Sequence, residues 1–366
     1  MKKILFTGGG TGGHIFPIIA IAEEIEKNDS EVNLSYMGPE DFTSRTFLPR
    51  KNIKTYFILS GKIRRFFSPK SIFLNFIDIF KVFFGTIQAF LIMFFTMPDF
   101  IFSKGGFGSI PVVISGYILR IPIFMHESDS TPGLANKISG RFAKKIFVSF
   151  ENTNFFPKNK VILTGAPVRK SLLGGNKEEA LKILSLKGEK PIVLILGGSQ
   201  GSERINEVIL SSLSEMLQSF EVIHQTGIKD FKNIKNESRA LIEENLLKNY
   251  HPHFFLDEKE LASAYAVADY IVGRSGGGMI SEVSLVGKPS ILIPLPGSAQ
   301  NHQVKNAYAY AKNGASIVLE EPNFTKYFFL NKLKNIDKEK MSNAARSFSK
   351  PLAAEKISKE VLDFLK

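Results

Sequence analysis

Near its beginning the chain carries the stretch ILFTGGGTGGHIFPIIAIAEEI, residues 4–25. An apolar run of strand type leads into a glycine-rich loop, and isoleucines then recur at the helical spacing of three and four residues. Glycine lets such a loop turn tightly, so that backbone N–H groups and the positive end of the helix dipole come close to an anion. The stretch therefore predicts a strand, a phosphate-binding loop and a helix.

A second glycine-rich loop, GGSQG at residues 197–201, lies about 190 residues further along the chain. It also follows an apolar run, and apolar residues at helical spacing follow it in turn. Two such loops indicate two halves, each of which binds a phosphorylated ligand.

Runs of strand type alternate with helical patterns along most of the chain. The predicted strands are 2–7, 32–37, 53–59, 99–103, 121–125, 145–149 and 161–164 in the first half, and 191–196, 221–225, 253–256, 269–273, 290–294 and 315–319 in the second. This alternation is typical of βαβ units and of parallel sheets. The predicted fold class is therefore α/β, with two doubly wound, Rossmann-like domains.

The length of 366 residues exceeds what one hydrophobic core usually serves. The segment TGAPVR, residues 164–169, breaks both periodicities because it combines glycine with proline. We therefore predict an N-terminal domain over 1–165, a C-terminal domain over 166–345 and a final helical segment over 346–366.

Charge is unevenly distributed within the net +12. Residues 1–165 hold 20 Lys and Arg against 12 Asp and Glu, whereas the remainder holds 27 against 23. The N-terminal half therefore favours an anionic partner, either nucleic acid or an acidic membrane surface, although an A+T-rich genome would produce the same lysine richness.

Cysteine is absent, which excludes disulfides, thiolate metal sites and a cysteine nucleophile. The N-terminus lacks the pattern of a secretory signal, so a cytoplasmic protein is expected. His251 and His253 have no partners at metal-ligand spacing, and we predict neither a bound metal nor a cofactor.

The first loop also matches the dinucleotide pattern GxGxxG at Gly8, Gly10 and Gly13. That interpretation requires an acidic residue at the end of the second strand, and the nearest candidates are Glu40 and Asp41, beyond a turn. The histidine that follows is a candidate general base because its ordinary pKa is about 6.5. A helix-start histidine without chemistry is the alternative.

Two further segments have the composition of a nucleotide-sugar site. RSGGGMISE at 274–282 follows a predicted strand and starts a helix, and its glutamate could accept hydrogen bonds from ribose hydroxyls or simply favour the helix dipole. The run QNHQVKN at 300–306 places several amides at a helix start, and amides pair well with sugar hydroxyls.

The segment 62–100 is the most unusual in composition. Lysines and arginines alternate with phenylalanines over 62–80, which is typical of a surface that docks at a membrane interface, with core packing as the alternative. Residues 82–98 carry no charge but fall short of the roughly 20 apolar residues of a membrane span. We therefore predict that 82–98 is the buried helix leading into the strand 99–103.

The ordered set of motifs resembles the MurG family of peptidoglycan N-acetylglucosaminyltransferases from residue 1 to about 320. The motifs are GGTGGH at 9–14, KGGF at 104–107, HE at 126–127 with GLANK at 133–137, PVR at 167–169, GGSQG at 197–201, RSG at 274–276 with Glu282, and HQ at 302–303 with Asn306. The resemblance implies transfer of N-acetylglucosamine from UDP-N-acetylglucosamine to lipid I, undecaprenyl-diphospho-N-acetylmuramoyl-pentapeptide, which forms lipid II with inversion.

The resemblance also implies a GT-B fold, with two Rossmann-like domains that face each other across a cleft and a C-terminal helix that returns to the N-terminal domain. On the acceptor side it assigns His14 as the candidate base and the diphosphate of lipid I to Thr11, Gly12 and Gly13. On the donor side it assigns the diphosphate to Ser199, uracil to Leu256, ribose to Glu282, and the sugar hydroxyls to Gln303 and Asn306. Arg169 and the residues Gly277, Gly278, Met279, Ile280 and Ser281 complete the implied donor pocket, and Asp129 is a further implied substrate-binding residue.

Departures from the family pattern occur at two positions. Asp129 stands where the family usually has Asn, which adds a negative charge near an anionic pocket, and Ala166 replaces the usual Asn before Pro167. Because the surrounding motifs are intact, we expect activity to be retained.

The resemblance implies UDP-N-acetylglucosamine, lipid I and the cytoplasmic face of the cell (inner) membrane as partners. Other cell-wall synthesis proteins are possible partners, and nucleic acid is not an expected one. The protein would be cytoplasmic and peripheral on that membrane. Two alternatives remain at this point: a UDP-sugar epimerase of similar two-domain fold, and a nucleotide-binding membrane module without catalysis.

Overall fold

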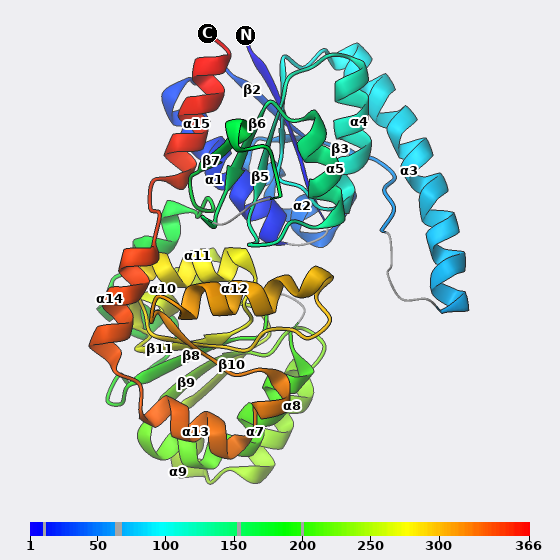
Figure 1. The fold of residues 1–366 in the computed structure, drawn as a ribbon. Helices are drawn as coiled ribbons and strands as arrows, with labels where there is room; N and C mark the ends of the chain where they lie inside the picture. Colours follow the sequence, from blue (N-terminus) through cyan, green and yellow to red (C-terminus); the bar gives the residue numbers. More distant parts are fainter. Residues whose placement is uncertain (10–11, 63–67, 152–154, 199–200) are drawn as a thin grey trace. The chain divides into compact units, whose positions relative to one another are not determined.

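The computed structural model describes residues 1–9, 12–62, 68–151, 155–198 and 201–366. The chain forms two compact units (Figure 1). The first comprises Met1–Arg169 together with Lys350–Lys366, and the second comprises Lys170–Ser349.

The first unit contains a seven-stranded parallel sheet in the order β3-β2-β1-β4-β5-β6-β7. Its strands are β1 Lys3–Thr7, β2 Asn33–Gly38, β3 Lys54–Phe57, β4 Phe100–Ser103, β5 Ile123–Glu127, β6 Lys145–Val148 and β7 Val161–Leu163. The order reverses between β1 and β4, and crevices at the carboxyl ends of strands beside such a reversal are where open α/β sheets bind ligands.

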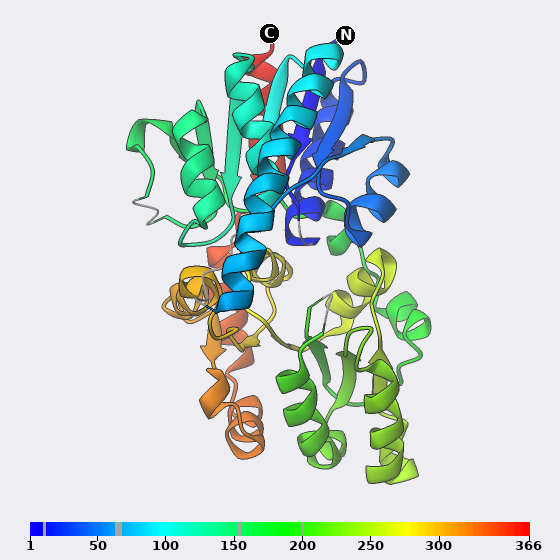
Figure 2. The same ribbon diagram turned by 90° about the vertical axis from the view of Figure 1, so that its right-hand side faces the viewer.

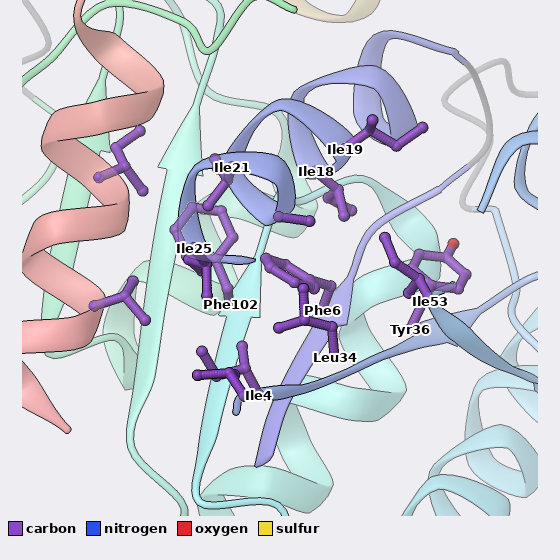
Figure 3. Packing of buried hydrophobic residues seen from close by; sticks show 14 of the residues in the cluster. Ile4, Phe6, Ile18, Ile19, Ile21, Ile25, Leu34, Tyr36, Ile53 and Phe102 are labelled. Carbon is purple, nitrogen blue, oxygen red and sulfur yellow. The ribbon is translucent and has the colours of Figure 1, made fainter. Parts of the chain in front are cut away.

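Helices cover both faces of this sheet. They are α1 Gly12–Asn28, α2 Phe42–Phe47, α3 Pro69–Thr96, α4 Ile110–Ile118, α5 Leu134–Phe142 and α15 Ala353–Phe364. Figure 3 shows Ile18, Ile21 and Ile25 of α1 packed toward Ile4 and Phe6 of β1. The C-terminal helix α15 joins this cluster, and Leu5 on the other face of β1 belongs to a second cluster with α3 and α4. Successive residues of β1 therefore serve opposite faces of the sheet.

The second unit contains a six-stranded parallel sheet in the order β10-β9-β8-β11-β12-β13. Its strands are β8 Ile192–Leu196, β9 Glu221–Gln225, β10 Tyr250–His253, β11 Tyr270–Gly273, β12 Ser290–Leu292 and β13 Ser316–Val318. Its α-helices are α6 Lys177–Ile183, α7 Glu203–Ser219, α8 Phe231–Leu241, α9 Glu244–Leu247, α10 Glu258–Val267, α11 Gly277–Val286, α12 His302–Ala311, α13 Lys326–Lys334 and α14 Lys338–Phe348. The predicted α/β class with two parallel sheets is confirmed.

One predicted strand was displaced along the chain. Sequence analysis predicts it at 253–256, but β10 spans Tyr250–His253 and includes Pro252. Proline is tolerated there because β10 is an edge strand, which leaves one row of backbone groups unpaired. The apolar residues after it have another role, since Leu256 is buried and donates its backbone N–H to Gln225.

The prediction of a buried helix at 82–98 was wrong about burial. Helix α3 connects β3 to β4 as expected, but Ala89 and Met93 face α4 while most of its large apolar side chains are exposed. Figure 2 shows α3 running along one side of the unit and extending past the strands at its N-terminal end. The exposed residues are Ile72, Phe73, Phe76, Ile79, Phe80, Phe83, Phe84, Ile87, Leu91, Phe94 and Phe95.

The prediction that this region falls short of a membrane span was also wrong. Ser71–Thr96 is long and apolar enough to cross a membrane on length and composition alone, and an 18-residue window within it has a mean hydropathy of 1.8. Only 17% of that window is buried within the protein. A helix so apolar and so poorly covered needs another environment for its exposed face.

Replacing Gly85 with Ala is expected to destabilise the first unit by about 1–3 kcal/mol, because an added Cβ would overlap the backbone carbonyl of Leu59. Urea denaturation monitored by circular dichroism would measure the change. Gly174→Ala is the matched control, since its Cβ would have only ordinary contacts. Equal midpoints for the two variants would show that α3 can move away from the Leu59 segment without penalty.

Candidate functional site

In the first unit, loops at the carboxyl ends of β1, β4 and β5 bring together three of the sequence motifs, those of His14, Gly106 and Glu127. His14 lies in the first turn of α1, and Gly106 follows β4 with a φ of +83°. A Cβ on Gly106 would come within 3.0 Å of His14 Nε2 and 2.9 Å of the Gly9 carbonyl oxygen. Glycine is therefore required there for both conformation and space.

Glu127 ends β5 and is almost completely buried. Its Oε2 accepts a hydrogen bond from Asn136 Nδ2 at 2.7 Å, and its Oε1 accepts one from the Asp129 backbone N–H at 2.9 Å. The amide oxygen of Asn136 in turn accepts a bond from the Gly106 N–H at 3.3 Å. Burial, and then the charge of Asp129, raises the pKa of Glu127 to about 7.

His14 is half-buried, but its Nδ1 atom is fully buried and has no hydrogen-bond partner among the residues that the structure describes. Burial, and then the positive charge of Lys104, lowers the pKa of His14 to about 4, against opposing effects of Asp129 and Asp41. The imidazole is therefore neutral at neutral pH and has a lone pair with which it can accept a proton.

The other predicted residues of the first unit are placed as follows. Gly12 is buried and Gly13 is exposed at the start of α1, and Thr11 lies outside the described residues. Arg169, which sequence analysis groups with the donor pocket, belongs to the first unit. It is 4% exposed, and its guanidinium carbon lies 3.9 Å from the centre of the Phe16 ring.

In the second unit, Gln225 at the end of β9 connects two predicted donor segments. Its Nε2 donates to the Gly198 carbonyl at 3.1 Å, and its Oε1 accepts from the Leu256 N–H at 3.0 Å. Sequence analysis missed Gln225, although its place at a strand end beside a glycine loop was a usable signal. Ser199, the predicted diphosphate contact, lies outside the described residues.

Helix α11 begins at the predicted ribose and phosphate segment. Its N-cap is Gly276, which makes no side-chain cap bond, and no described atom lies within 4 Å of a Cβ added at Gly276 or Gly278. This helix start is therefore open to an anion. Glu282 Oε2 accepts a hydrogen bond from Tyr265 at 2.8 Å.

The remaining members of this segment differ in burial. Met279 is half-buried, the Ser281 hydroxyl donates to the Gly277 carbonyl at 2.9 Å, and the Ile280 side chain is fully buried in the unit.

The predicted sugar-contacting amides are held by the loop after β11. Asn306 is fully buried and donates to the Ser275 carbonyl at 3.2 Å, and the Ser275 hydroxyl donates to the Gln303 carbonyl at 2.8 Å. The Gln303 side-chain oxygen accepts from the Leu295 N–H at 3.0 Å. Because these bonds join α12 to the loop that starts α11, the two predicted donor segments form one cluster.

Arg274 connects this cluster to the second glycine loop. Its Nη2 donates to the Ser202 hydroxyl at 2.7 Å, and Ser202 is the N-cap of α7 directly after that loop. Glu321 pairs with its Nη1 at 2.7 Å. Arg274 therefore anchors the start of α7, directly after that loop. Across the described ranges, no three His, Asp or Glu side chains converge as a metal site would require.

Comparison with known proteins agrees with this arrangement. The N-terminal domain model of glycosyltransferase family 28 matches residues 4–148, and its C-terminal domain model matches residues 192–361. A Bacillus cereus protein named UDP-N-acetylglucosamine–N-acetylmuramyl-(pentapeptide) pyrophosphoryl-undecaprenol N-acetylglucosamine transferase 2 is 41% identical over 325 residues, 88% of each chain.

Two solved structures share the fold. The crystal structure of Acinetobacter baumannii MurG superposes with a TM-score of 0.73 at 24% identity and covers 99% of this chain and 100% of its own. A UDP-GlcNAc 2-epimerase from Neisseria meningitidis superposes with a TM-score of 0.62 at 16% identity, over 99% and 100% of the two chains. Fold alone therefore does not separate a transferase from an epimerase, whereas the sequence relationship does. The chain belongs to glycosyltransferase family 28 and, within it, to the MurG family of N-acetylglucosamine transferases.

Proposed function

We propose that the protein transfers N-acetylglucosamine from UDP-N-acetylglucosamine to lipid I, which gives lipid II. The observation that carries this proposal is the close relationship to a protein named for that transfer, across both domains. The two glycine loops, one in each unit, support it because donor and acceptor both contain a diphosphate.

The donor is assigned to the C-terminal domain, predicted over 166–345. The open N-terminus of α11 and the loop at 197–201 would receive its diphosphate, with Ser199 as the predicted side-chain contact. Leu256 would line the uracil site and Glu282 would hold the ribose. Gln303 and Asn306, both of which are bonded to Ser275, would read the sugar hydroxyls.

The acceptor is assigned to the N-terminal domain, predicted over 1–165, with its diphosphate at Thr11, Gly12 and Gly13. His14 would take the proton of the C4 hydroxyl of N-acetylmuramic acid while that oxygen forms a bond to the anomeric carbon. The bond from that carbon to the diphosphate breaks at the same time, and UDP leaves with the electron pair. A single displacement of this kind inverts the anomeric centre. The neutral state of His14 at neutral pH supports this role.

Product analysis separates this function from the two alternatives. The protein would be incubated with radiolabelled UDP-N-acetylglucosamine and a lipid I analogue. We expect label in the lipid product together with free UDP. Label in an epimerised nucleotide sugar would identify an epimerase, and unchanged donor would leave only a binding module.

We further propose that α3 docks the protein on the cytoplasmic face of the membrane. Its exposed phenylalanines, at positions 73, 76, 80, 83, 84, 94 and 95, form an apolar surface that nothing in the described part of the first unit covers. Aromatic side chains suit the boundary between headgroups and acyl chains. Lys62 is exposed, and the remaining predicted cations Arg64, Arg65 and Lys70 are known from sequence only.

Docking in the plane of the membrane fits α3 better than spanning does. The Gln88 side-chain oxygen accepts the Leu59 N–H at 2.9 Å, and the Ser115 hydroxyl of α4 donates to the Thr86 carbonyl at 2.8 Å. Insertion across a bilayer would break these bonds and expose the buried stripe of Ala89 and Met93.

Replacing Phe73, Phe76 and Phe80 together by Ser is expected to reduce cosedimentation with anionic vesicles by at least about tenfold, because each exposed ring contributes apolar area to the interface. Replacing Tyr327 and Phe328, an exposed aromatic pair of the second unit, is the matched control and should leave binding unchanged.

The cationic contribution is tested by replacing Arg64, Arg65 and Lys70 by Ser. At about 1 kcal/mol for each charge, the loss is about 100-fold, and high salt should reproduce it in the parent but not reproduce the phenylalanine effect. If both triple variants stay bound to vesicles while donor affinity is normal, the docking surface lies elsewhere.

A further inference from the structure

Lys104 is a buried charged residue of the acceptor cluster to which sequence analysis assigns no role. It follows β4 directly and is 1% exposed. Its Nζ donates to the Ser128 hydroxyl at 2.5 Å, across to the loop after β5. A lysine is rarely buried to this degree unless a compensating charge is close.

Carboxylates from the neighbouring loop supply that compensation. Glu127 and Asp129 flank Ser128, and the negative charge of each opposes the lowering of the Lys104 pKa that burial causes. Glu127 cannot turn away, because Asn136 and the Asp129 backbone hold both of its oxygens. The Lys104 ammonium, Glu127 and Asp129 therefore form one cluster of charges at the ends of β4 and β5.

His14, in the first turn of α1, is within the electrostatic influence of this cluster of charges. The charged groups that act on its imidazole are Lys104 after β4, Asp129 after β5 and Asp41 before α2. Removal of the Lys104 charge would leave two carboxylates as the charges nearest His14, and these favour its protonated form.

We propose that Lys104 is a positioning residue of the transfer reaction: its buried ammonium holds the Ser128 loop against the end of β4 and balances the carboxylates of Glu127 and Asp129 in the loop cluster that includes His14. The role of Lys104 in catalysis rests on the proposed function. Its effect on the pKa of His14 does not.

The first test is an NMR titration of the His14 ring in the full-length protein, with His14→Ala to assign the signal. In the parent, the signal should titrate near the pKa of about 4 that burial and Lys104 produce. In Lys104→Met the midpoint should move up toward the ordinary value of about 6.5. In Lys104→Arg, which keeps the charge, it should stay low.

A double variant separates charge balance from damage to the fold. Lys104→Met combined with Asp129→Asn removes one charge of each sign, so its His14 midpoint should return toward that of the parent. The two substitutions are then strongly non-additive. Circular dichroism and UDP affinity, which reports the second unit, confirm that each variant is folded.

The activity readout is the pH profile of kcat/KM for the lipid I analogue. If the His14 pKa returned fully to about 6.5, Lys104→Met would lose about tenfold at pH 5.5 relative to pH 8 through protonation of His14, a loss through this group that the parent should not show. Purely structural damage would instead lower the rate uniformly across pH.

Two results would overturn the proposal: an unchanged His14 midpoint in folded Lys104→Met, or a double variant whose midpoint stays as high as that of the single variant. If the parent protein did not transfer the sugar at all, the proposed function would be wrong. The titration would still decide whether Lys104 controls the pKa of His14. If Lys104→Met does not fold, the double variant and Lys104→Arg decide the question through the same titration.

Discussion

Replacing His14 by Ala is expected to lower single-turnover transfer by about 10²–10⁴-fold, the usual contribution of a general base, while UDP-N-acetylglucosamine affinity is unchanged. His14 belongs to the first unit, and the proposed donor residues other than Arg169 belong to the second. The imidazole is neutral because burial and Lys104 oppose its protonation. Loss of the side chain therefore removes a proton acceptor without removing a donor contact.

Rapid-quench kinetics with saturating donor and acceptor measures this effect directly. His253→Ala is the matched control, because that half-buried histidine of the second unit lies outside the proposed site and should leave the rate unchanged. If His14→Ala transferred sugar as fast as the parent, the residue would be a structural part of the α1 start and the base would have to be found elsewhere.

Replacing Glu282 by Ala is expected to weaken UDP-N-acetylglucosamine binding by about 10–150-fold, which corresponds to about 1.5–3 kcal/mol for a lost charge-assisted hydrogen-bond partner. The carboxylate lies one and a half turns into α11, beyond an open glycine start, and the Tyr265 hydroxyl orients it. Calorimetry measures the affinity, and the rate from the bound complex should change much less.

Tyr265→Phe is the matched variant for this carboxylate. It removes the 2.8 Å hydrogen bond but keeps the charge, so it should weaken donor binding less than Glu282→Ala does. Unchanged donor affinity in Glu282→Ala would remove the ribose assignment. An equal loss in both variants would show that the orientation of Glu282, rather than its charge, determines binding.

The sheets and the glycine loops could be predicted from sequence because their signals are local. Apolar runs separated by helical repeats indicate βαβ units, and a glycine cluster between a strand and a helix indicates a phosphate loop. Lys104 could not be assigned in this way, and the only local signal for Gln225 was its place at the end of a predicted strand. Their roles depend on partners 24 and 31 residues away, Ser128 and Leu256, and no periodic pattern marks such a contact.

The exposure of α3 could not be predicted from the sequence, for a different reason. A helix that is apolar around most of its circumference is usually buried, so the pattern alone favours a core helix. The structure shows that α4 covers only one stripe of it. The same pattern of apolar residues serves a helix in a protein core and a helix on a membrane surface. The sequence of the helix therefore does not say whether protein or membrane covers its other faces.

The most direct test of the account is the configuration of the sugar linkage in the product. The protein would be incubated with UDP-N-acetylglucosamine and a lipid I analogue, and the anomeric proton coupling of the new linkage would be read by NMR. The account predicts a disaccharide whose new linkage has the anomeric configuration opposite to that of the donor, formed together with free UDP. A linkage of retained configuration, or an epimerised nucleotide sugar without any disaccharide, would contradict it.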